Sequence, residues 1–228
     1  MKGKLFGIGV GAGEADLLTI RAVNTIKKCD VIAVVANGES KYAFNIVKEY
    51  LTNKVVQECE FSMSPNLDTR MESRKKVFKQ IRKLLDNGND VGFLTIGDPT
   101  IYSTYMYVHK MINDVGYETE IISGIPSFIA AAGKLNISLC EGEEQLHIIP
   151  ASKMSSEQIK TMMELSGNKV IMKSARNLGN VVENLKASED NIYVVKNCCL
   201  EGEEIYQNLG TIEDLEKLGY LTIVLVKE

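Results

Sequence analysis

The residues best suited to chemistry lie at positions 97–104, Gly-Asp-Pro-Thr-Ile-Tyr-Ser-Thr, directly after an apolar segment. Asp98 offers a carboxylate that could receive hydrogen bonds or face a cation. Gly97 lets the backbone approach a ligand closely, and Pro99 fixes the direction of the chain. A helix that begins after Pro99 offers Asp98 a second role, because aspartate is a good helix cap. The residue types alone leave both roles of Asp98 open.

A second candidate is the glycine-rich loop at positions 7–13, Gly-Ile-Gly-Val-Gly-Ala-Gly. From Gly7 it imitates the dinucleotide fingerprint G-x-G-x-x-A, so a nicotinamide dehydrogenase is one alternative. That enzyme also needs an acid at the end of the second strand. Asp30 precedes this strand, and Glu39 comes roughly ten residues later than the usual spacing of about 20. A tight structural turn is the other interpretation of this loop.

A third loop, Gly-Ile-Pro-Ser-Phe at positions 124–128, leads into three alanines at 130–132. Small residues allow a helix to pack closely on a sheet, so the alanines are expected in the core. In open parallel α/β sheets, ligands bind where strands run into such loops.

Short apolar segments alternate with amphipathic segments along the whole chain, which indicates the α/β class. Thr19 is expected to cap the first helix, with Ile20, Ala22, Val23 and Ile26 on its apolar side. Strands are predicted at residues 4–10, 31–36, 55–56, 91–96, 119–122, 147–149, 169–173, 192–195, 203–206 and 221–226. Further helices are predicted at 42–51, 68–85, 102–113, 127–135, 156–165, 180–185 and 211–217.

The composition excludes several classes of protein. The 228 residues are 45% hydrophobic and carry a net charge of −4, which argues against a general nucleic-acid binder. No apolar run approaches the roughly 18 residues of a membrane span, and no signal peptide is evident. Five cysteines without a C-x-x-C pair suggest reduced, buried thiols in a cytoplasmic protein. Two distant histidines give a metal site little support, and we expect none.

Together the three loops resemble the tetrapyrrole methylase family, whose members methylate corrin and sirohaem precursors with S-adenosylmethionine. The first loop and residues 17–22, Leu-Leu-Thr-Ile-Arg-Ala, resemble the opening signature, and 97–102 resemble the G-D-P-x-x-Y loop. The third loop and the last strand also resemble family segments. Ala12, Glu14 and Ser123 depart from the family's usual proline, aspartate and proline.

The resemblance implies two α/β domains with mainly parallel or mixed sheets, at 1–140 and 141–228, and a cofactor cleft between them. It also implies a homodimer. The second and third loops most resemble enzymes that methylate C20 of precorrin-2 or cobalt-precorrin-2 in cobalamin biosynthesis. The expected substrate is therefore a reduced tetrapyrrole. Methylation at another position of a corrin or sirohaem precursor, and a noncatalytic binding module, stay as alternatives.

The resemblance also implies a set of contacts to S-adenosylmethionine: Gly97, Asp98, Ile101, Tyr102, Ser127, Ala151 and Met172. A turn at Cys198-Cys199 is expected to close the far side of this site. Asp98 is the candidate catalytic residue, as acceptor of the proton that leaves the methylated carbon. Basic residues of the helix at 68–85 either attract the acetate and propionate groups of a tetrapyrrole or form a solvated face.

Overall fold

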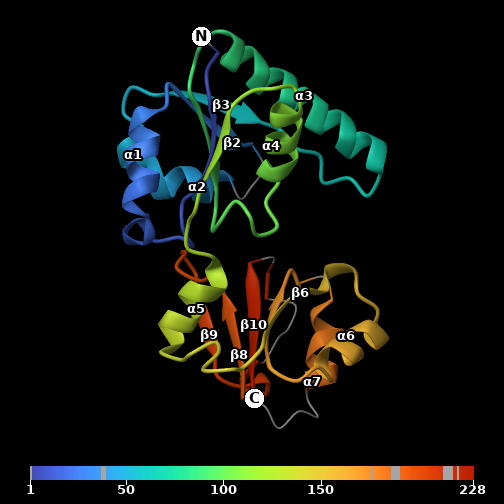
Figure 1. Cartoon of the computed structure of the whole chain (residues 1–228). Coiled ribbons are helices and arrows are strands. Elements are labelled where there is room, and N and C mark those ends of the chain that lie inside the picture. Colours follow the sequence, from blue (N-terminus) through green and yellow to red (C-terminus); the bar gives the residue numbers. More distant parts are fainter. Residues whose placement is uncertain (1, 37–39, 176, 186–190, 213–217, 220) are drawn as a thin grey trace. The chain divides into compact units, whose positions relative to one another are not determined.

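A computed structural model describes residues 2–36, 40–175, 177–185, 191–212, 218–219 and 221–228 (Figure 1). The chain forms two compact units, Met1–Pro126 and Ser127–Glu228, and each contains a five-stranded sheet. The predicted α/β class with mainly parallel or mixed sheets is confirmed. The boundary expected at residues 140 and 141 lies inside the second unit, in the segment that follows its first helix.

The first unit is built on a fully parallel sheet with the strand order β3-β2-β4-β1-β5. Its central strands are continuous apolar runs, as is typical of strands covered on both faces. All five carboxyl ends therefore lie along one edge, which we call the first carboxyl edge. The strands are β1 (Leu5–Gly9), β2 (Val31–Val35), β3 (Val55–Cys59), β4 (Val91–Thr95) and β5 (Thr119–Ile122).

Helices cover both faces of this sheet, because alternate strand residues point to opposite sides. Ile8 and Ile32 pack with Ile26 in one buried cluster, and Phe93 packs with Val77 in the other. Figure 1 shows α1 and α2 on one side, and α3 and α4 on the other. The helices are α1 (Ile20–Lys28), α2 (Ser40–Val47), α3 (Leu67–Asp86) and α4 (Tyr105–Asp114), with 3-10 turns η1 (Ala15–Leu17) and η2 (Lys48–Tyr50).

Two helix ends in this unit test the local sequence signals. The predicted cap at Thr19 is confirmed: its hydroxyl accepts a hydrogen bond from the Ala22 N–H at 3.1 Å. Ile20 is 81% exposed, so its predicted place on the apolar side is wrong. At the other end of the unit, α4 begins at Tyr105 rather than at the predicted residue 102.

The second unit has a mixed sheet with the strand order β6-β7-β10-β8-β9. Strand β10 runs antiparallel to both β7 and β8, so the carboxyl ends of β6, β7 and β8 share one edge, the second carboxyl edge. The strands are β6 (Leu146–Pro150), β7 (Asn168–Met172), β8 (Asn191–Lys196), β9 (Glu204–Tyr206) and β10 (Thr222–Lys227).

Helices α6 and α7 cover one face of this sheet, where Val194 and Val224 pack with Ile159 and Val182. The alternate strand residues point to the other face, where α5 contacts β10. The helices are α5 (Ser127–Leu135), α6 (Ser156–Met163) and α7 (Leu178–Leu185), with 3-10 turns η3 (Ala151–Lys153) and η4 (Leu209–Thr211). Most of the helix predicted at 211–217 lies outside the described residues.

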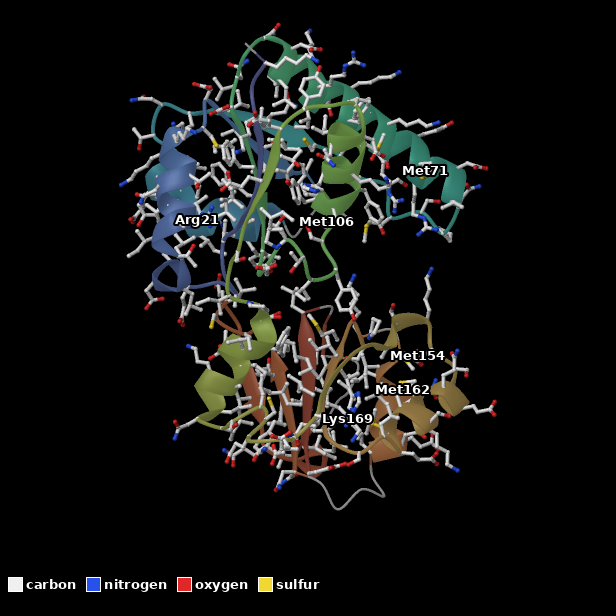
Figure 2. All side chains as sticks on the ribbon, viewed as in Figure 1. Arg21, Met71, Met106, Met154, Met162 and Lys169 are labelled. Atoms are coloured by element: carbon white, nitrogen blue, oxygen red, sulfur yellow. The ribbon has the colours of Figure 1, made fainter. Side chains whose placement is uncertain are left out.

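The second unit also buries one lysine, Lys169 on β7, which is labelled in Figure 2. Its ammonium donates to the Gly167 carbonyl at 2.6 Å and lies 3.5 Å from a carboxylate oxygen of Glu228. These contacts offset the cost of burying the charge. Among the described residues, no helix combines the length and apolar character that crossing a membrane requires.

Candidate functional site

Three backbone segments converge at the first carboxyl edge, where β1, β4 and β5 end. A Cβ atom at Gly124 would lie 2.2 Å from the Gly97 carbonyl oxygen, and one at Gly9 would lie 2.5 Å from the Gly124 nitrogen. The Gly97 N–H donates to the Gly11 carbonyl at 2.7 Å. Glycine is therefore required at Gly9 and Gly124, because backbone packs closely on backbone there. We call this meeting point of the three segments the glycine junction.

Asp98, a residue that is 7% exposed, joins two of these segments through its carboxylate. One oxygen accepts hydrogen bonds from the N–H and the hydroxyl of Thr100, at 2.8 and 2.5 Å. The other accepts from the Gly124 N–H at 3.0 Å. Asp98 does not cap α4, because the cap position of that helix is Thr104. The helix-cap role considered for Asp98 is therefore wrong, and a loop-tying role takes its place.

The strand order puts this junction at a topological switch point. After β1 the chain crosses to β2, towards one end of the strand order. After β4 it crosses to β5, towards the opposite end. Loops that diverge in this way leave room for a ligand outside the carboxyl ends of the two strands. The first and second loops of the sequence, at 7–13 and 97–104, border this point.

Tyr102 lies in the loop that begins at Gly97. It is 42% exposed, and partial burial raises the pKa of its hydroxyl. Its φ of +51° excludes it from the start of a helix, so its predicted helical position is wrong. Ile101, its neighbour, is half-buried. A bulky residue in the left-handed region costs about 1 kcal/mol or more, and such strain often accompanies a functional site.

The predicted contact residues of the second unit lie at or near its own carboxyl edge. Ala151 is fully buried just after β6, and Met172 ends the adjacent strand β7, in register with Pro150. Ser127 is half-buried at the start of α5. Sequence reasoning missed Asn177, whose side-chain amide donates to the Ala151 carbonyl at 2.9 Å. The asparagine has no motif around it that would have indicated this role.

Backbone strain is concentrated at these two edges. Among the described residues, three that are neither glycine nor asparagine have a positive φ: Tyr102, Lys173 and Cys199. Tyr102 follows β4, Lys173 follows β7 and Cys199 follows β8. All three therefore lie past the carboxyl ends of strands, where ligands bind in α/β proteins.

The basic helix α3 divides into two parts. Towards its carboxyl end, Arg82 pairs with Asp86, as expected of a solvated face. Nearer its start, the Arg74 guanidinium lies 3.4 Å from the centre of the Tyr107 ring, in cation–π geometry. Met71, labelled in Figure 2, is within 3.7 Å of the same guanidinium. The start of α3 thus offers a cation held in place by an aromatic ring.

The fold is that of a two-domain α/β protein. Each unit has a residue other than glycine with a strained backbone at its carboxyl edge, and the first unit has the glycine junction at a switch point. These features are typical of ligand-binding α/β proteins. Residues 4–216 match the family of tetrapyrrole (corrin/porphyrin) methylases. The chain belongs to this family. The predicted family and the predicted methyltransferase class are thereby confirmed. Glu39, the acid considered for the dehydrogenase alternative, lies outside the described residues.

Two relatives cover nearly the whole chain. A probable cobalt-precorrin-2 C(20)-methyltransferase of Methanocaldococcus jannaschii is 34% identical over 231 residues, which cover 98% of this chain and 96% of the relative. A cobalt-precorrin-2 C(20)-methyltransferase of Salmonella typhimurium is 26% identical, with 100% and 98% covered.

The fold is shared with solved structures of tetrapyrrole methyltransferases, including two that cover nearly the whole chain. A cobalt precorrin-4 methyltransferase superposes with a TM-score of 0.77 at 18% identity, covering 98% of this chain and 94% of that one. A uroporphyrin-III C-methyltransferase from Thermus thermophilus gives a TM-score of 0.75 at 16% identity, with 99% and 94% covered. The two-domain α/β architecture is that of these enzymes.

Proposed function

We propose that this protein transfers a methyl group from S-adenosylmethionine to C20 of precorrin-2 or cobalt-precorrin-2, a step of cobalamin biosynthesis. The observation that carries the proposal is the 34% identity, over nearly the full length of both chains, to a relative named for C20 methylation of cobalt-precorrin-2. That relative favours the cobalt-containing ring as the substrate. A precorrin-2 C(20)-methyltransferase of Sinorhizobium, 27% identical over 82% of this chain, supports the same position on the metal-free ring.

S-adenosylmethionine supplies the methyl group as an electrophilic carbon on a sulfonium. Its adenine suits apolar surroundings, and its ribose and amino-acid portions suit backbone and hydroxyl groups. The two carboxyl edges offer both kinds of group, with apolar side chains such as Ile101 and Met172 and a hydroxyl group on Ser127. We infer that the residues implied by the family resemblance bind the methyl donor, namely Gly97, Asp98, Ile101, Tyr102, Ser127, Ala151 and Met172.

The main task of these residues is to position the reactants. Methyl transfer is a direct displacement, so the ring carbon, the methyl carbon and the sulfur must lie in line. Holding reactants in such an arrangement can contribute roughly 7–11 kcal/mol to catalysis. The Asp98 carboxylate serves this task by fixing the loops that contain Gly97 and Gly124. Asp98 is also our candidate for the acceptor of the proton that leaves the methylated carbon.

The start of α3 provides a place for the acidic side groups of the ring. Arg74 is fixed against Tyr107, which reduces the side-chain freedom lost when a carboxylate binds. Bidentate contact between a guanidinium and an acetate or propionate group would then orient the macrocycle. The fixed position of the Arg74 guanidinium supports the choice of an acidic tetrapyrrole over an uncharged methyl acceptor.

Calorimetry and turnover together test the proposed function. S-adenosylhomocysteine should bind with a Kd in the micromolar range, about −8 kcal/mol, and NAD should give no saturable heat. Mixed with S-adenosylmethionine and precorrin-2 or cobalt-precorrin-2, the protein should add one methyl group to the ring, as read by mass spectrometry. Saturable NAD binding without S-adenosylhomocysteine binding would contradict the proposal.

We also propose that the protein acts as a homodimer, as the family resemblance implies, and in the cytoplasm, as its five cysteines without a C-x-x-C pair suggest. Sedimentation equilibrium should give twice the mass of 25.3 kDa for one chain. A monomer at micromolar concentration would contradict the dimer without affecting the proposed chemistry.

A further inference from the structure

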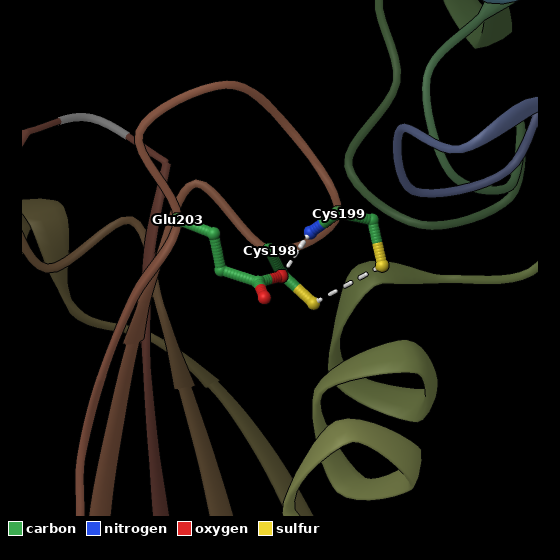
Figure 3. Close-up of side chains that lie close together, drawn as sticks. All are labelled: Cys198, Cys199 and Glu203. Carbon is green, nitrogen blue, oxygen red and sulfur yellow. Dashed lines mark hydrogen bonds between the residues drawn. The ribbon is translucent and has the colours of Figure 1, made fainter.

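Two cysteines and a glutamate converge in the turn between β8 and β9, as Figure 3 shows. The Sγ atoms of Cys198 and Cys199 lie 3.7 Å apart. A carboxylate oxygen of Glu203 and the two sulfurs all lie within 4.8 Å of one another. Both cysteines are buried, at 3% and 7% exposure. The methyl-transfer chemistry proposed above uses none of these three side chains.

The separation of the sulfurs matches the demands of a metal ion. Zinc–sulfur bonds are about 2.3 Å long, and a tetrahedral angle between two of them places the sulfurs about 3.8 Å apart. We propose that Cys198, Cys199 and Glu203 form a binding site for a thiophilic divalent cation of the Zn²⁺ class. This proposal departs from the sequence-based expectation of no metal, which rested on there being two histidines far apart in the chain.

The turn holds the third ligand in place before any metal arrives. One oxygen of Glu203 accepts a hydrogen bond from the Cys199 N–H at 2.6 Å, which keeps the carboxylate beside the thiols. The turn is tight, with φ of +61° at Cys199 and +77° at Gly202. The Leu200 N–H closes it by donating to the Asn197 carbonyl at 2.8 Å. A preformed turn of this kind reduces the ordering that metal binding has to impose.

The charges around the cluster balance in both states. Without metal, the Glu203 carboxylate faces the Lys134 ammonium of α5 at 3.8 Å, and the two thiols are buried as neutral groups. Binding of one divalent cation displaces the two thiol protons to solvent. Two thiolates, one carboxylate and the cation then carry a net charge of −1, which the Lys134 ammonium offsets. The buried region therefore gains no uncompensated charge.

The fourth position of a tetrahedral cation is left for water or another ligand. A cation held by residues 198, 199 and 203 would pin the β8–β9 turn at the second carboxyl edge. Its binding requires only this turn and α5, so the inference does not depend on the proposed methylation. A failure of methyl transfer and a failure of metal binding are separate results.

Calorimetry with ZnCl₂ on the intact, fully reduced protein tests the site. We expect one equivalent bound with a Kd in the micromolar range or tighter. Titrations in two buffers of different ionisation enthalpy should show release of about two protons for each cation, because both thiols must deprotonate. Substituting Co²⁺ should produce a thiolate-to-metal charge-transfer band. No saturable binding, or binding without this band, would overturn the proposal.

Matched variants locate the ligands. Cys198→Ala and Cys199→Ala should each abolish the charge-transfer band or weaken binding by at least about tenfold, and Glu203→Gln should weaken it while keeping an acceptor for the Cys199 N–H. Cys140→Ala removes an exposed thiol elsewhere and should bind as the parent protein does. Circular dichroism verifies folding, and Glu203→Gln serves as the deciding variant if a cysteine variant unfolds. Undiminished binding by folded variants at 198, 199 and 203 would overturn the assignment.

Discussion

The Asp98 carboxylate accepts a hydrogen bond from the Gly124 N–H at 3.0 Å, and this contact links positions 26 residues apart in the chain. It ties the loop after β4 to the loop after β5, at the edge where the glycine junction lies. Three donors reach this one carboxylate, two of them from Thr100. The acid in the chain's most characteristic loop thus shapes the backbone of the candidate site.

Replacing Asp98 by asparagine should lower both the stability of the protein and its rate of methyl transfer. The asparagine oxygen can still accept from Thr100, but its amide group cannot accept from the Gly124 N–H. We expect a loss of stability of about 1 kcal/mol. We also expect turnover to fall by roughly 10²-fold or more if the charge of Asp98 receives the departing proton. Urea unfolding and a methyl-transfer assay on the same preparation measure the two effects.

Thr100→Val is the matched control for Asp98→Asn. It removes the hydroxyl that donates to Asp98 at 2.5 Å but retains the carboxylate and the bond to Gly124. This variant should retain turnover within a few-fold of the parent protein. Parental turnover in Asp98→Asn would leave the residue with its structural role alone.

The glycine junction predicts opposite effects for two glycine-to-alanine changes. A Cβ at Gly124 would meet the Gly97 carbonyl oxygen at 2.2 Å, so Gly124→Ala should destabilise the protein by about 1–3 kcal/mol. Gly133 lies inside α5, and a Cβ added there would meet no atom of another segment within 4 Å, so Gly133→Ala should stabilise by about 0.5–1 kcal/mol. Urea denaturation measures both. Equal stability of the two variants would contradict the close packing of the loops.

Hydrophobic pattern and cap residues predicted most of the fold. Thr19 starts α1 as expected, and α3 ends at Asn87-Gly88, where the glycine takes a positive φ. The start of α4 was misplaced because the left-handed turn at Tyr102 leaves no mark on the apolar periodicity. Contacts between distant segments, such as Asp98 with Gly124, depend on strand order, which local patterns do not specify.

The family resemblance predicts more residues of the candidate site than the residue types alone do. It predicts that Ala151 and Met172 contact one ligand. Ala151 directly follows β6, and Met172 ends the adjacent strand β7. An isolated alanine and methionine give no chemical signal in the sequence. The cluster at Cys198 was missed as a ligand set because Glu203 reaches the cysteines only through the shape of the turn.

Two variants of Tyr102 should distinguish the contribution of its ring to cofactor binding from the effect of its backbone strain on stability. Tyr102→Phe retains the ring, so the Kd for S-adenosylhomocysteine should stay within a few-fold of the parent value. Tyr102→Gly removes the ring and relieves a φ of +51°, so stability should be unchanged or higher while affinity falls by about tenfold. Calorimetry and thermal melts provide the two readings. Parental affinity in Tyr102→Gly would remove the residue from the binding site.

The ion pair between Lys4 and Glu120 predicts a pH dependence of stability. The Lys4 ammonium lies 2.8 Å from the Glu120 carboxylate, and this hydrogen bond lowers the pKa of Glu120 below its ordinary 4.5. The stabilisation is therefore present above pH 4.5 and lost as the pH falls through the lower folded-state value. The same bond raises the pKa of Lys4 above 10.5, so its stabilisation is present below pH 10.5 and lost as the pH rises through the higher value.

Glu120→Gln should cost up to about 1 kcal/mol at neutral pH, because the pair is partly exposed. The difference from the parent protein should shrink towards both acid and alkaline pH, as read by urea unfolding across the pH range. Glu118→Gln is the matched control, since Glu118 is 3.8 Å from Lys4 and largely exposed. A pH-independent difference for Glu120→Gln would contradict the electrostatic origin of the effect.

Methylation at C20 can be followed directly through the transferred methyl group. The protein is incubated with S-adenosylmethionine labelled with ¹³C in the methyl group and with either precorrin-2 or cobalt-precorrin-2, and the product is analysed by NMR. We expect one ¹³C methyl group, attached at C20, with the cobalt-containing ring as the better substrate. A labelled methyl at any other ring position, or no label on either ring from protein that binds S-adenosylhomocysteine, would contradict this expectation.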